Sequence, residues 1–378
     1  MKLLAIGTVS DIAHNIFTGQ SIMFDSIIKY MESHSIETHV VDISSKNRKN
    51  NILFRSLEYI LILLEILFKL ITNRYDLCYI TTAQSRKGFY RDYAIIYLCR
   101  IFKVPVIIHQ FGANYKQLTD ALNERERQKL KSILAYSDYI IVEGEYMKKQ
   151  YSFLEHYEEK VKVIPNGLTT TGKSALRPKT YSHGHPFVMY YLSNMIWSKG
   201  YFDVLQAVDI LVNKDKRDVK CVFAGKFMTS ADDVRPGISS KKDFDKYVEE
   251  HHLSSVVSYF PGMYGGQKDE MFAKANVFLL PSYYINEGQP VSIIESMAYG
   301  CVPIVTKYRH IPMMVNKENG CFVEARKPEQ IAKAVTGLMD YPEVYADKSI
   351  SCINDYKEKF TFEKYASGVI SLMDSIND

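Results

Sequence analysis

The stretch NVFLLPSYYINEGQPVSIIESMAYGCVPIVTK, Asn276 to Lys307, decides the fold. It opens with a continuous apolar run, crosses a polar loop, continues as a helix-like segment and closes with a second apolar run. Continuous apolar strands joined by a helix are typical of a parallel sheet that is covered on both faces. The stretch therefore predicts a strand–helix–strand unit of the α/β class.

The same alternation runs through the whole chain of 378 residues, a length that suggests two or three domains. Apolar strand-like runs lie at residues 2–7, 38–43, 77–81, 104–111, 138–144, 161–167, 186–193, 219–225, 256–262, 276–282 and 302–307. We expect two doubly wound, Rossmann-like α/β domains that face each other across a cleft. The predicted parts are an N-terminal acceptor-binding domain (1–168), a linker (169–186), a C-terminal nucleotide-binding domain (187–356) and a helix (357–378) that packs back on the N-terminal domain.

The composition, 47% hydrophobic and 24% charged, is that of a globular protein, and no run reaches the roughly 18 apolar residues of a membrane span. The first residues, MKLLAIGTVSD, resemble a first strand more than a leader peptide. The six cysteines are scattered without CxxC or metal-ligand spacing, which favours buried free thiols in a reducing compartment. We therefore expect a cytoplasmic protein.

Positive charge is concentrated between Ser44 and Lys103, where eleven Lys and Arg stand against four Asp and Glu, a local charge of +7. Nucleic acid, an anionic membrane surface or a phosphorylated substrate could each meet such a patch. Within it, the predicted helix Arg55–Thr72 is apolar on nearly every side. Such a helix is either wedged between the sheet and its neighbours or partly inserted in a bilayer, and the sequence leaves both open.

The predicted helix after the loop Asn286–Gln289 has the features of an anion site at its N-terminus. Pro290 suits the first helical position, with Gln289 as the cap, so the amides of Val291 and Ser292 would point out of the helix end. Gly288 allows a ligand to approach the backbone closely. A phosphate is the anion that such an end prefers.

Two glutamates, Glu287 and Glu295, flank this helix end, where a bare carboxylate would repel a phosphate. They are explained if each accepts hydrogen bonds from neutral hydroxyls instead. Glu295 could then hold a ribose diol and Glu287 the hydroxyls of a second sugar, which together with the phosphates describe a nucleotide-sugar. The alternative is an ordinary loop–helix junction in which acids are favoured by the helix dipole.

The C-terminal half resembles the retaining GT-B glycosyltransferases of family 4, which carry an E-x7-E motif. The resemblance rests on YLSNMIWSKGYFDVLQAV, CVFAGKF, YFPGMYGGQKDEMFAKANVFLLPSYYINEGQPVSIIESMAYGCVPIVT and NGCFV. The N-terminal half matches more loosely, through FTGQSIMFDSIIKYM and IIHQFGANY.

The resemblance implies that Glu295 binds the donor ribose and that Glu287 lies beside the donor sugar. The backbone from Gly288 to Ser292 would hold the sugar and diphosphate, and Lys199 would neutralise the diphosphate. Lys199 precedes a glycine and a predicted helix start, a suitable place for a point charge, although an isolated lysine there is usually a surface residue.

Two further positions of this half follow from the resemblance. Met263 would contact the base through its backbone, or would simply be a packing methionine. Asn194 stands where many members carry an arginine that holds the diphosphate, so the second cation is missing or comes from elsewhere, such as Lys226.

In the N-terminal half, the resemblance places the loop of Thr18, Gly19 and Gln20 opposite the diphosphate and acceptor, where a glycine permits close approach. His109 follows an apolar strand and matches a family histidine near the donor sugar; a lone histidine would more often belong to the core. The basic and aromatic segment Arg86–Tyr93, with Arg86, Lys87 and Arg91, could meet a lipid diphosphate or form a solvated loop.

The implied reaction transfers a hexosyl or N-acetylhexosaminyl group with retention, from a nucleoside diphosphate sugar, UDP favoured, to a saccharide acceptor. The departing phosphate would take the acceptor proton, so no protein nucleophile is needed, and Glu287, His109 and Lys199 would be the catalytic set. No metal is expected, since Asp243 and Asp245, the one Asp-x-Asp pair, lie in a charged helix-like run.

Family habit suggests a lipid-diphosphate-linked oligosaccharide acceptor in polysaccharide or lipopolysaccharide synthesis, at the inner face of the cell membrane. An anionic membrane surface is then the expected partner of the basic window, and nucleic acid is not. Two alternatives stay open: an epimerase or hydrolase on the same fold, and a non-catalytic subunit that binds sugar nucleotides.

Overall fold

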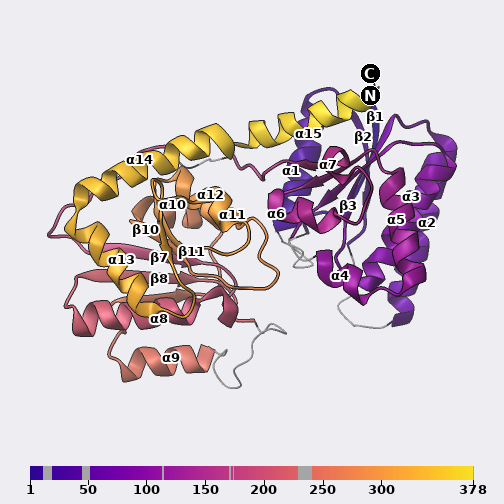
Figure 1. The fold of residues 1–378 in the computed structure, drawn as a ribbon. Helices are drawn as coiled ribbons and strands as arrows, with labels where there is room; N and C mark the ends of the chain where they lie inside the picture. Colours follow the sequence, from indigo (N-terminus) through magenta and orange to yellow (C-terminus); the bar gives the residue numbers. More distant parts are fainter. Residues whose placement is uncertain are drawn as a thin grey trace. The chain divides into compact units, whose positions relative to one another are not determined.

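Two parallel sheets organise the computed structural model, which describes residues 1–11, 19–44, 52–112, 115–169, 172, 174–228 and 241–377 (Figure 1). The chain divides into a first unit, Met1–Asn166 with Glu363–Asp378, and a second unit, Gly167–Phe362. Over the described residues, each unit contains one sheet of six strands, all of them parallel.

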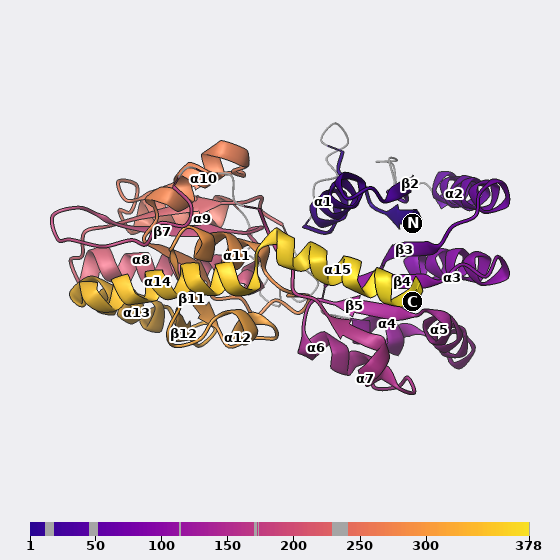
Figure 2. The ribbon, with the colours of Figure 1, turned by 90° about the horizontal axis from the view of Figure 1, so that it is seen from above.

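The sheet of the first unit has the order β2-β1-β3-β4-β5-β6. Its strands are β1 (Lys2–Gly7), β2 (Glu37–Asp42), β3 (Leu77–Thr82), β4 (Val106–Gln110), β5 (Tyr139–Val142) and β6 (Val161–Val163). The helices are α1 (Gly19–Ser33), α2 (Ile52–Thr72), α3 (Arg86–Ile101), α4 (Tyr115–Ala121), α5 (Glu124–Tyr136), α6 (Glu145–Lys148), α7 (Tyr157–Lys160) and α15 (Phe362–Asn377). Figures 1 and 2 show α1 and α15 on one face of this sheet, and α2, α3 and α5 side by side on the other.

Burial explains why the central strands are apolar without alternation. Every residue of β3 and β4 is buried, because helices cover both faces of the sheet.

Helix α5 begins at a capping box. The Asn123 side chain accepts a hydrogen bond from the Glu126 amide, and the Glu126 side chain accepts one from the Asn123 amide.

The sheet of the second unit has the order β12-β11-β10-β7-β8-β9. Its strands are β7 (Phe187–Leu192), β8 (Val219–Ala224), β9 (Val257–Phe260), β10 (Val277–Leu280), β11 (Val302–Thr306) and β12 (Cys321–Val323). The helices are α8 (Tyr201–Asp209), α9 (Lys241–Glu250), α10 (Gly265–Lys274), α11 (Val291–Ala298), α12 (Ile311–Met314), α13 (Pro328–Asp340) and α14 (Pro342–Lys359). In Figure 1, α8, α9 and α13 lie on one face of this sheet and α10, α11 and α14 on the other.

The strand order reverses between β7 and β10. The chain leaves β7 toward β8 and β9 on one side, and then returns through α10 to β10 on the other side. In doubly wound sheets, ligands bind beyond the carboxyl ends of the strands at such a switch point. The loops that follow β7 and β10 are therefore the place to look for a site.

The segment predicted as a linker, 169–186, does not stand apart, and its described residues belong to the second unit. The Lys179 amide donates to Ser349 Oγ at 2.8 Å, and Lys179 Nζ donates to the Phe272 carbonyl at 2.6 Å. Polar, glycine-rich composition indicated a hinge, but these long-range hydrogen bonds fix the segment to its own unit. The last boundary also differs, since the second unit continues to Phe362 rather than ending at residue 356.

The other differences from the predicted elements are local. All eleven predicted strands form, while the three-residue β12 had no prediction. The segment Arg86–Tyr93 is no loop but the beginning of α3, where the Ser85 side chain accepts from the Gly88 amide. None of the helices in the described ranges combines the length and apolar character that a bilayer crossing requires.

Candidate active site

The loop after β7 and the loop after β10 meet at the switch point of the second sheet. The amide of Tyr283, in the second loop, donates to the Ser198 carbonyl in the first at 2.7 Å. Gly200 makes this approach possible: it has φ +79°, and a Cβ there would lie 2.6 Å from the Pro281 carbonyl oxygen. The first loop holds a short 3-10 turn, Trp197–Lys199, that ends at this glycine.

Lys199 and Glu287 form an ion pair across the two loops, with Lys199 Nζ 3.2 Å from Glu287 Oε1. The side chains are only 15% and 5% exposed. Ser282 Oγ donates to the second carboxylate oxygen, and Thr306 donates to the Ser282 carbonyl. Since a carboxylate offers about four acceptor positions, Glu287 can still accept hydrogen bonds from a ligand.

Helix α11 begins directly after this pair, and its N-cap residue, Pro290, has no side-chain acceptor for the first amides of the helix. The first helical residue is Val291, so the predicted start is wrong by one position. Pro290 is the N-cap, because its ψ of 108° is extended, and its carbonyl accepts the Ile293 amide at 3.0 Å. A helix N-terminus beside a lysine attracts an anion.

Glu295 lies farther along α11 and forms an ion pair with Lys268 of α10. The two side chains are 18% and 26% exposed, respectively. Burial raises the pKa of Glu295, and the charge of Lys268 and its hydrogen bond oppose that rise. Nothing in the sequence around Lys268 indicated this pairing, because only the packing of α10 beside α11 brings the two residues together.

The other residues predicted in this unit surround the helix end. Gln289 and Pro290 are buried, and Gly288, Val291 and Ser292 are half-buried. Asn194 is exposed, and its carbonyl accepts from the Ile196 amide at 2.8 Å. The Met263 side chain is buried, with its sulfur 3.5 Å from the Tyr190 hydroxyl, so only its backbone is suited to meet a base.

In the first unit, His109 lies on β4 and is fully buried. Its Nδ1 is 2.6 Å from the Tyr79 hydroxyl, and Phe111 stacks on the ring at 4.1 Å. Burial lowers the pKa of His109 to about 3, so the imidazole is neutral at physiological pH. Nε2 is buried and meets no hydrogen-bond partner among the described residues.

The remaining predicted residues of this unit differ in accessibility. Gly19 begins α1 and is exposed, and a Cβ there would meet nothing within 4 Å; Gln20 is half-buried, and Thr18 lies outside the described residues. Arg86 and Lys87 are exposed in the first turn of α3, where Arg86 pairs with Glu126 at 2.8 Å. Arg91 is largely buried against Asp92 at 2.7 Å, which suits a structural role.

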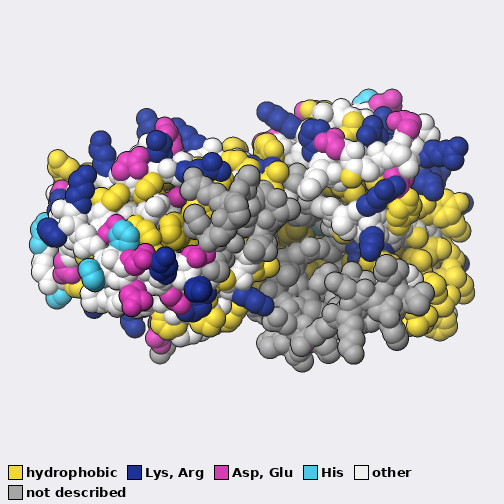
Figure 3. Space-filling model, turned by 90° about the horizontal axis from the view of Figure 1, so that it is seen from below, with side chains coloured by type: hydrophobic (Ala, Val, Ile, Leu, Met, Phe, Trp, Pro, Cys, Tyr) yellow, Lys and Arg dark blue, Asp and Glu magenta, His cyan; other side chains and the backbone are white. Residues whose placement is uncertain are grey.

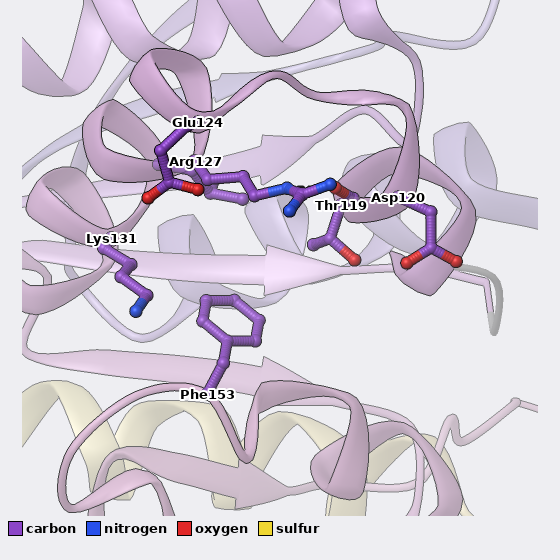
Figure 4. Close-up of a pocket in the computed structure, with 7 residues that line it drawn as sticks. Thr119, Asp120, Glu124, Arg127, Lys131 and Phe153 are labelled. Atoms are coloured by element: carbon purple, nitrogen blue, oxygen red, sulfur yellow. Dashed lines mark hydrogen bonds between the residues drawn. The ribbon is translucent and has the colours of Figure 1, made fainter.

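A hollow elsewhere in the first unit is lined by Thr119, Asp120, Glu124, Arg127, Leu130, Lys131 and Phe153. In Figure 4 the Arg127 side chain extends toward Thr119, whose carbonyl accepts from Arg127 Nε at 3.2 Å. Asp120 pairs with Lys116 at 2.8 Å. Arg127 and Asp120 therefore have partners within the protein, and the lining includes no predicted site residue, so this hollow is not the candidate site.

Metal-ligating residues do not cluster in the described ranges: no group of three or more His, Cys, Asp or Glu side chains is placed to hold an ion. Asp243 and Asp245 lie on α9, where Asp245 pairs with Lys241. Asp245 is exposed, and Asp243 is half-buried.

Known proteins share this fold. Residues 173–351, nearly the whole second unit, match the family model described as glycosyl transferases group 1. No curated protein matches the sequence. The structure of Anabaena HepE in complex with UDP is 14% identical, with a TM-score of 0.71 over 99% of this chain and 100% of that one.

Two further solved structures are similar over both units. The sucrose-phosphate synthase of Thermosynechococcus elongatus is 15% identical, with a TM-score of 0.69 over 100% of this chain and 99% of that one. The lipopolysaccharide outer core galactosyltransferase WaaB is 15% identical, with a TM-score of 0.69 over 99% of each chain. The chain therefore has the two-domain GT-B fold of glycosyltransferases, which confirms the predicted fold class.

Proposed function

We propose that the protein is a retaining glycosyltransferase of family 4, with Glu287 and Glu295 as its E-x7-E pair. It would move a sugar from a UDP-sugar to a saccharide acceptor. The observation that carries this proposal is the position of the α11 N-terminus, with the Lys199–Glu287 pair on one side and Glu295 on the other.

The helix end and Lys199 hold the diphosphate in this proposal. The amides of Val291 and Ser292 and the Lys199 ammonium stabilise the negative charge that grows on the leaving phosphate. Glu295 accepts hydrogen bonds from the ribose hydroxyls, and Glu287 accepts from the hydroxyls of the transferred sugar. Asn194 brings no charge, so Lys199 is the main cation of the site, with exposed Lys226 as a second source.

Retention without a protein nucleophile is supported by the hydrogen bonds that the Glu287 carboxylate already accepts. Its two oxygens already accept from Lys199 and Ser282, which lowers the nucleophilicity of the carboxylate. The departing phosphate oxygen instead takes the proton of the acceptor hydroxyl on the same face of the sugar. Neutral His109 is a polar neighbour of the donor sugar, and no metal takes part, because the helix end and Lys199 supply the positive charge.

The donor base and the acceptor rest on weaker support. Binding of UDP by HepE, which shares the fold, favours a UDP-sugar, with Met263 meeting the base through its backbone. The acceptor is a saccharide on a lipid diphosphate in polysaccharide or lipopolysaccharide synthesis, reached at the inner face of the cell membrane. Exposed Arg86 and Lys87, with Gln20, are its candidate contacts.

The test is sugar transfer by Glu295→Gln and Lys199→Met, measured against Lys241→Met as a matched control. Both site variants should lower turnover by about 100-fold or more, since each removes a charged contact to the transition state. The control removes an exposed lysine of the i,i+4 pair with Asp245 and should behave like the wild type.

Wild-type rates in both site variants would overturn the proposal. Consumption of the donor at full speed without any acceptor would favour an epimerase or hydrolase. Donor binding in calorimetry, without turnover on any acceptor, would favour a non-catalytic subunit.

A further inference from the structure

Helix α2 carries two apolar stripes on opposite sides. One consists of Ile62, Ile66 and Leu70, which are buried against the first unit. The other is exposed and consists of Leu57, Ile60, Leu61, Leu64, Phe68 and Ile71, each between 51% and 66% exposed. At about 100° per residue, the exposed six span a stripe of roughly 100°, centred roughly 170° from the buried one.

The sequence left open whether this helix is wedged between the sheet and its neighbours or partly inserted in a bilayer, and these exposures decide between the two interpretations. A helix wedged between the sheet and its neighbours would have both stripes covered, and this one does not. The second stripe of apolar side chains leaves more than half of each side chain exposed, so it contributes little to the packing of its own unit. Large exposed apolar patches mark a surface that another body covers.

Helix α3, which lies beside α2, extends the exposed patch (Figure 1). Its outer side presents Tyr90, Tyr97 and Ile101, which are 47%, 47% and 57% exposed, and Phe102 follows at 36%. We call these four residues and the six of α2 the α2–α3 face. Figure 3 shows a continuous band of hydrophobic side chains at the right-hand edge of the molecule, bordered by Lys and Arg.

Cations border the α2–α3 face on the described elements. Arg74 follows α2, Lys87 lies in the first turn of α3, Arg100 lies in its last turn, and Lys103 follows it; all four are exposed. Helix α5, which packs beside α3, adds the exposed Arg125, Lys129 and Lys131. Of the two acids on α2, Glu65 pairs with Lys69 at 3.9 Å, and Glu58 is half-buried. Lys46, Arg48 and Lys49 of the basic window lie outside the described residues.

We propose that the α2–α3 face lies in the headgroup region of an anionic lipid bilayer, with α2 parallel to the membrane plane. An apolar stripe along a helix of 21 residues, about 30 Å, with cations at its margin, is what an interfacial helix needs. The exposed tyrosines suit the same depth, since their rings are apolar and their hydroxyls reach water.

A second copy of the chain fits this face less well than a bilayer does. In a two-fold dimer the same surfaces face each other, so the bordering cations of one copy would lie against those of the other. The six exposed residues of α2 also offer no side-chain hydrogen-bonding group. A fluid surface with negative headgroups requires none and gains from every cation.

The reason for membrane binding rests on the proposed function, because a lipid-linked acceptor would lie in the same bilayer. Binding itself needs no donor or acceptor. A protein that binds vesicles but transfers no sugar would therefore contradict the proposed function alone.

The test is co-sedimentation of the full chain with vesicles of phosphatidylcholine alone or mixed equally with phosphatidylglycerol. Wild-type protein should bind the anionic vesicles, and less at high salt, because salt screens the attraction. Leu64→Ser combined with Phe68→Ser should lower this binding about tenfold or more, since two apolar anchors are lost. Met313→Ser combined with Tyr341→Ser is the control, because it removes two residues that are 62% and 59% exposed in the second unit.

Wild-type binding by the α2 variant, or equal loss in the control variant, would overturn the proposal. Failure of the wild type to bind anionic vesicles would do so as well. Sedimentation velocity tests whether a second copy of the chain covers the face instead. A wild-type dimer that the α2 variant converts to a monomer would assign the face to that second copy. Unchanged thermal unfolding of both variants is expected, because all four positions are exposed, and shows that each variant is folded.

Discussion

The ion pair between Lys268 and Glu295 controls the charge of the residue proposed to hold the ribose. Burial raises the pKa of Glu295, so this carboxyl would tend to hold its proton without a cation nearby. Lys268 opposes that tendency by its charge and by a hydrogen bond. It is a positioning residue, because it acts on the ligand through Glu295.

Replacing Lys268 with Met should therefore make donor binding more sensitive to acid. A carboxylate accepts hydrogen bonds from the ribose, so affinity is present above the pKa of Glu295 and is lost as the pH falls through it. Without Lys268 that pKa rises further, and the acid limb of UDP affinity moves to higher pH. In the pH range where Glu295 is protonated in the variant but ionised in the wild type, we expect roughly fivefold weaker binding, since hydrogen bonds to a charged group contribute about 1 kcal/mol more than neutral ones.

Calorimetric titration of UDP across the pH range measures this shift, and Lys268→Arg is the matched control. Arginine keeps the charge and should restore the acid limb to within experimental error of the wild type. If Lys268→Met weakens binding equally at every pH, the lysine does not act through the protonation of Glu295.

At the scale of elements, the site depends on the closeness of the loops after β7 and β10. Gly200 joins the first of these loops to α8 with a positive φ and packs directly on Pro281. Both the left-handed backbone and the short distance require a residue without a side chain. Lys199, the neighbouring residue, owes its position opposite Glu287 to this junction.

Gly200→Ala should destabilise the protein by about 1–3 kcal/mol, the usual cost of a strained backbone, and should also weaken donor binding. Gly337→Ala is the control, and its expected effect on the free energy of unfolding has the opposite sign. Gly337 lies in α13 with open space around it, so an alanine there should stabilise the helix by about 0.5–1 kcal/mol. Urea unfolding at equilibrium measures both changes, and a neutral Gly200→Ala would show that the two loops can separate without cost.

At the scale of the molecule, all the proposed donor contacts except His109 and Gly19 belong to the second unit. That unit has its own apolar core, and its two ends are joined. The Leu168 amide donates to the Phe360 carbonyl at 2.9 Å, and the Phe362 amide donates to the Leu168 carbonyl at 3.1 Å. A segment closed in this way has what an independently folding domain requires.

We therefore expect the fragment Gly167–Phe362 to unfold cooperatively on heating and to bind UDP. Saturating UDP, at about 100 times its dissociation constant, should raise the melting temperature by roughly 5–10 °C. The same fragment with Glu295→Gln should lose most of that shift. A fragment that folds but does not respond to UDP would mean that the first unit supplies essential donor contacts.

The sequence by itself determined the fold class, the strands and the end of α11. Apolar runs without alternation are typical of strands in a sheet that helices cover on both faces, so eleven strands were recognisable from the order of apolar residues along the chain. The start of α11 was predictable to within one residue, because a helix start is a local event that neighbouring residues specify.

Only the tertiary structure decided which distant residues meet. Lys268 and Ser282 join the two glutamates because α10 and the end of β10 pack beside α11, and no spacing along the chain encodes those contacts. The exposure of α2 was undecided for the same reason, since an all-apolar helix has the same sequence pattern whether one side or both are covered. Burial is a property of the packed layers, and it exists only once the sheet and its helices have assembled.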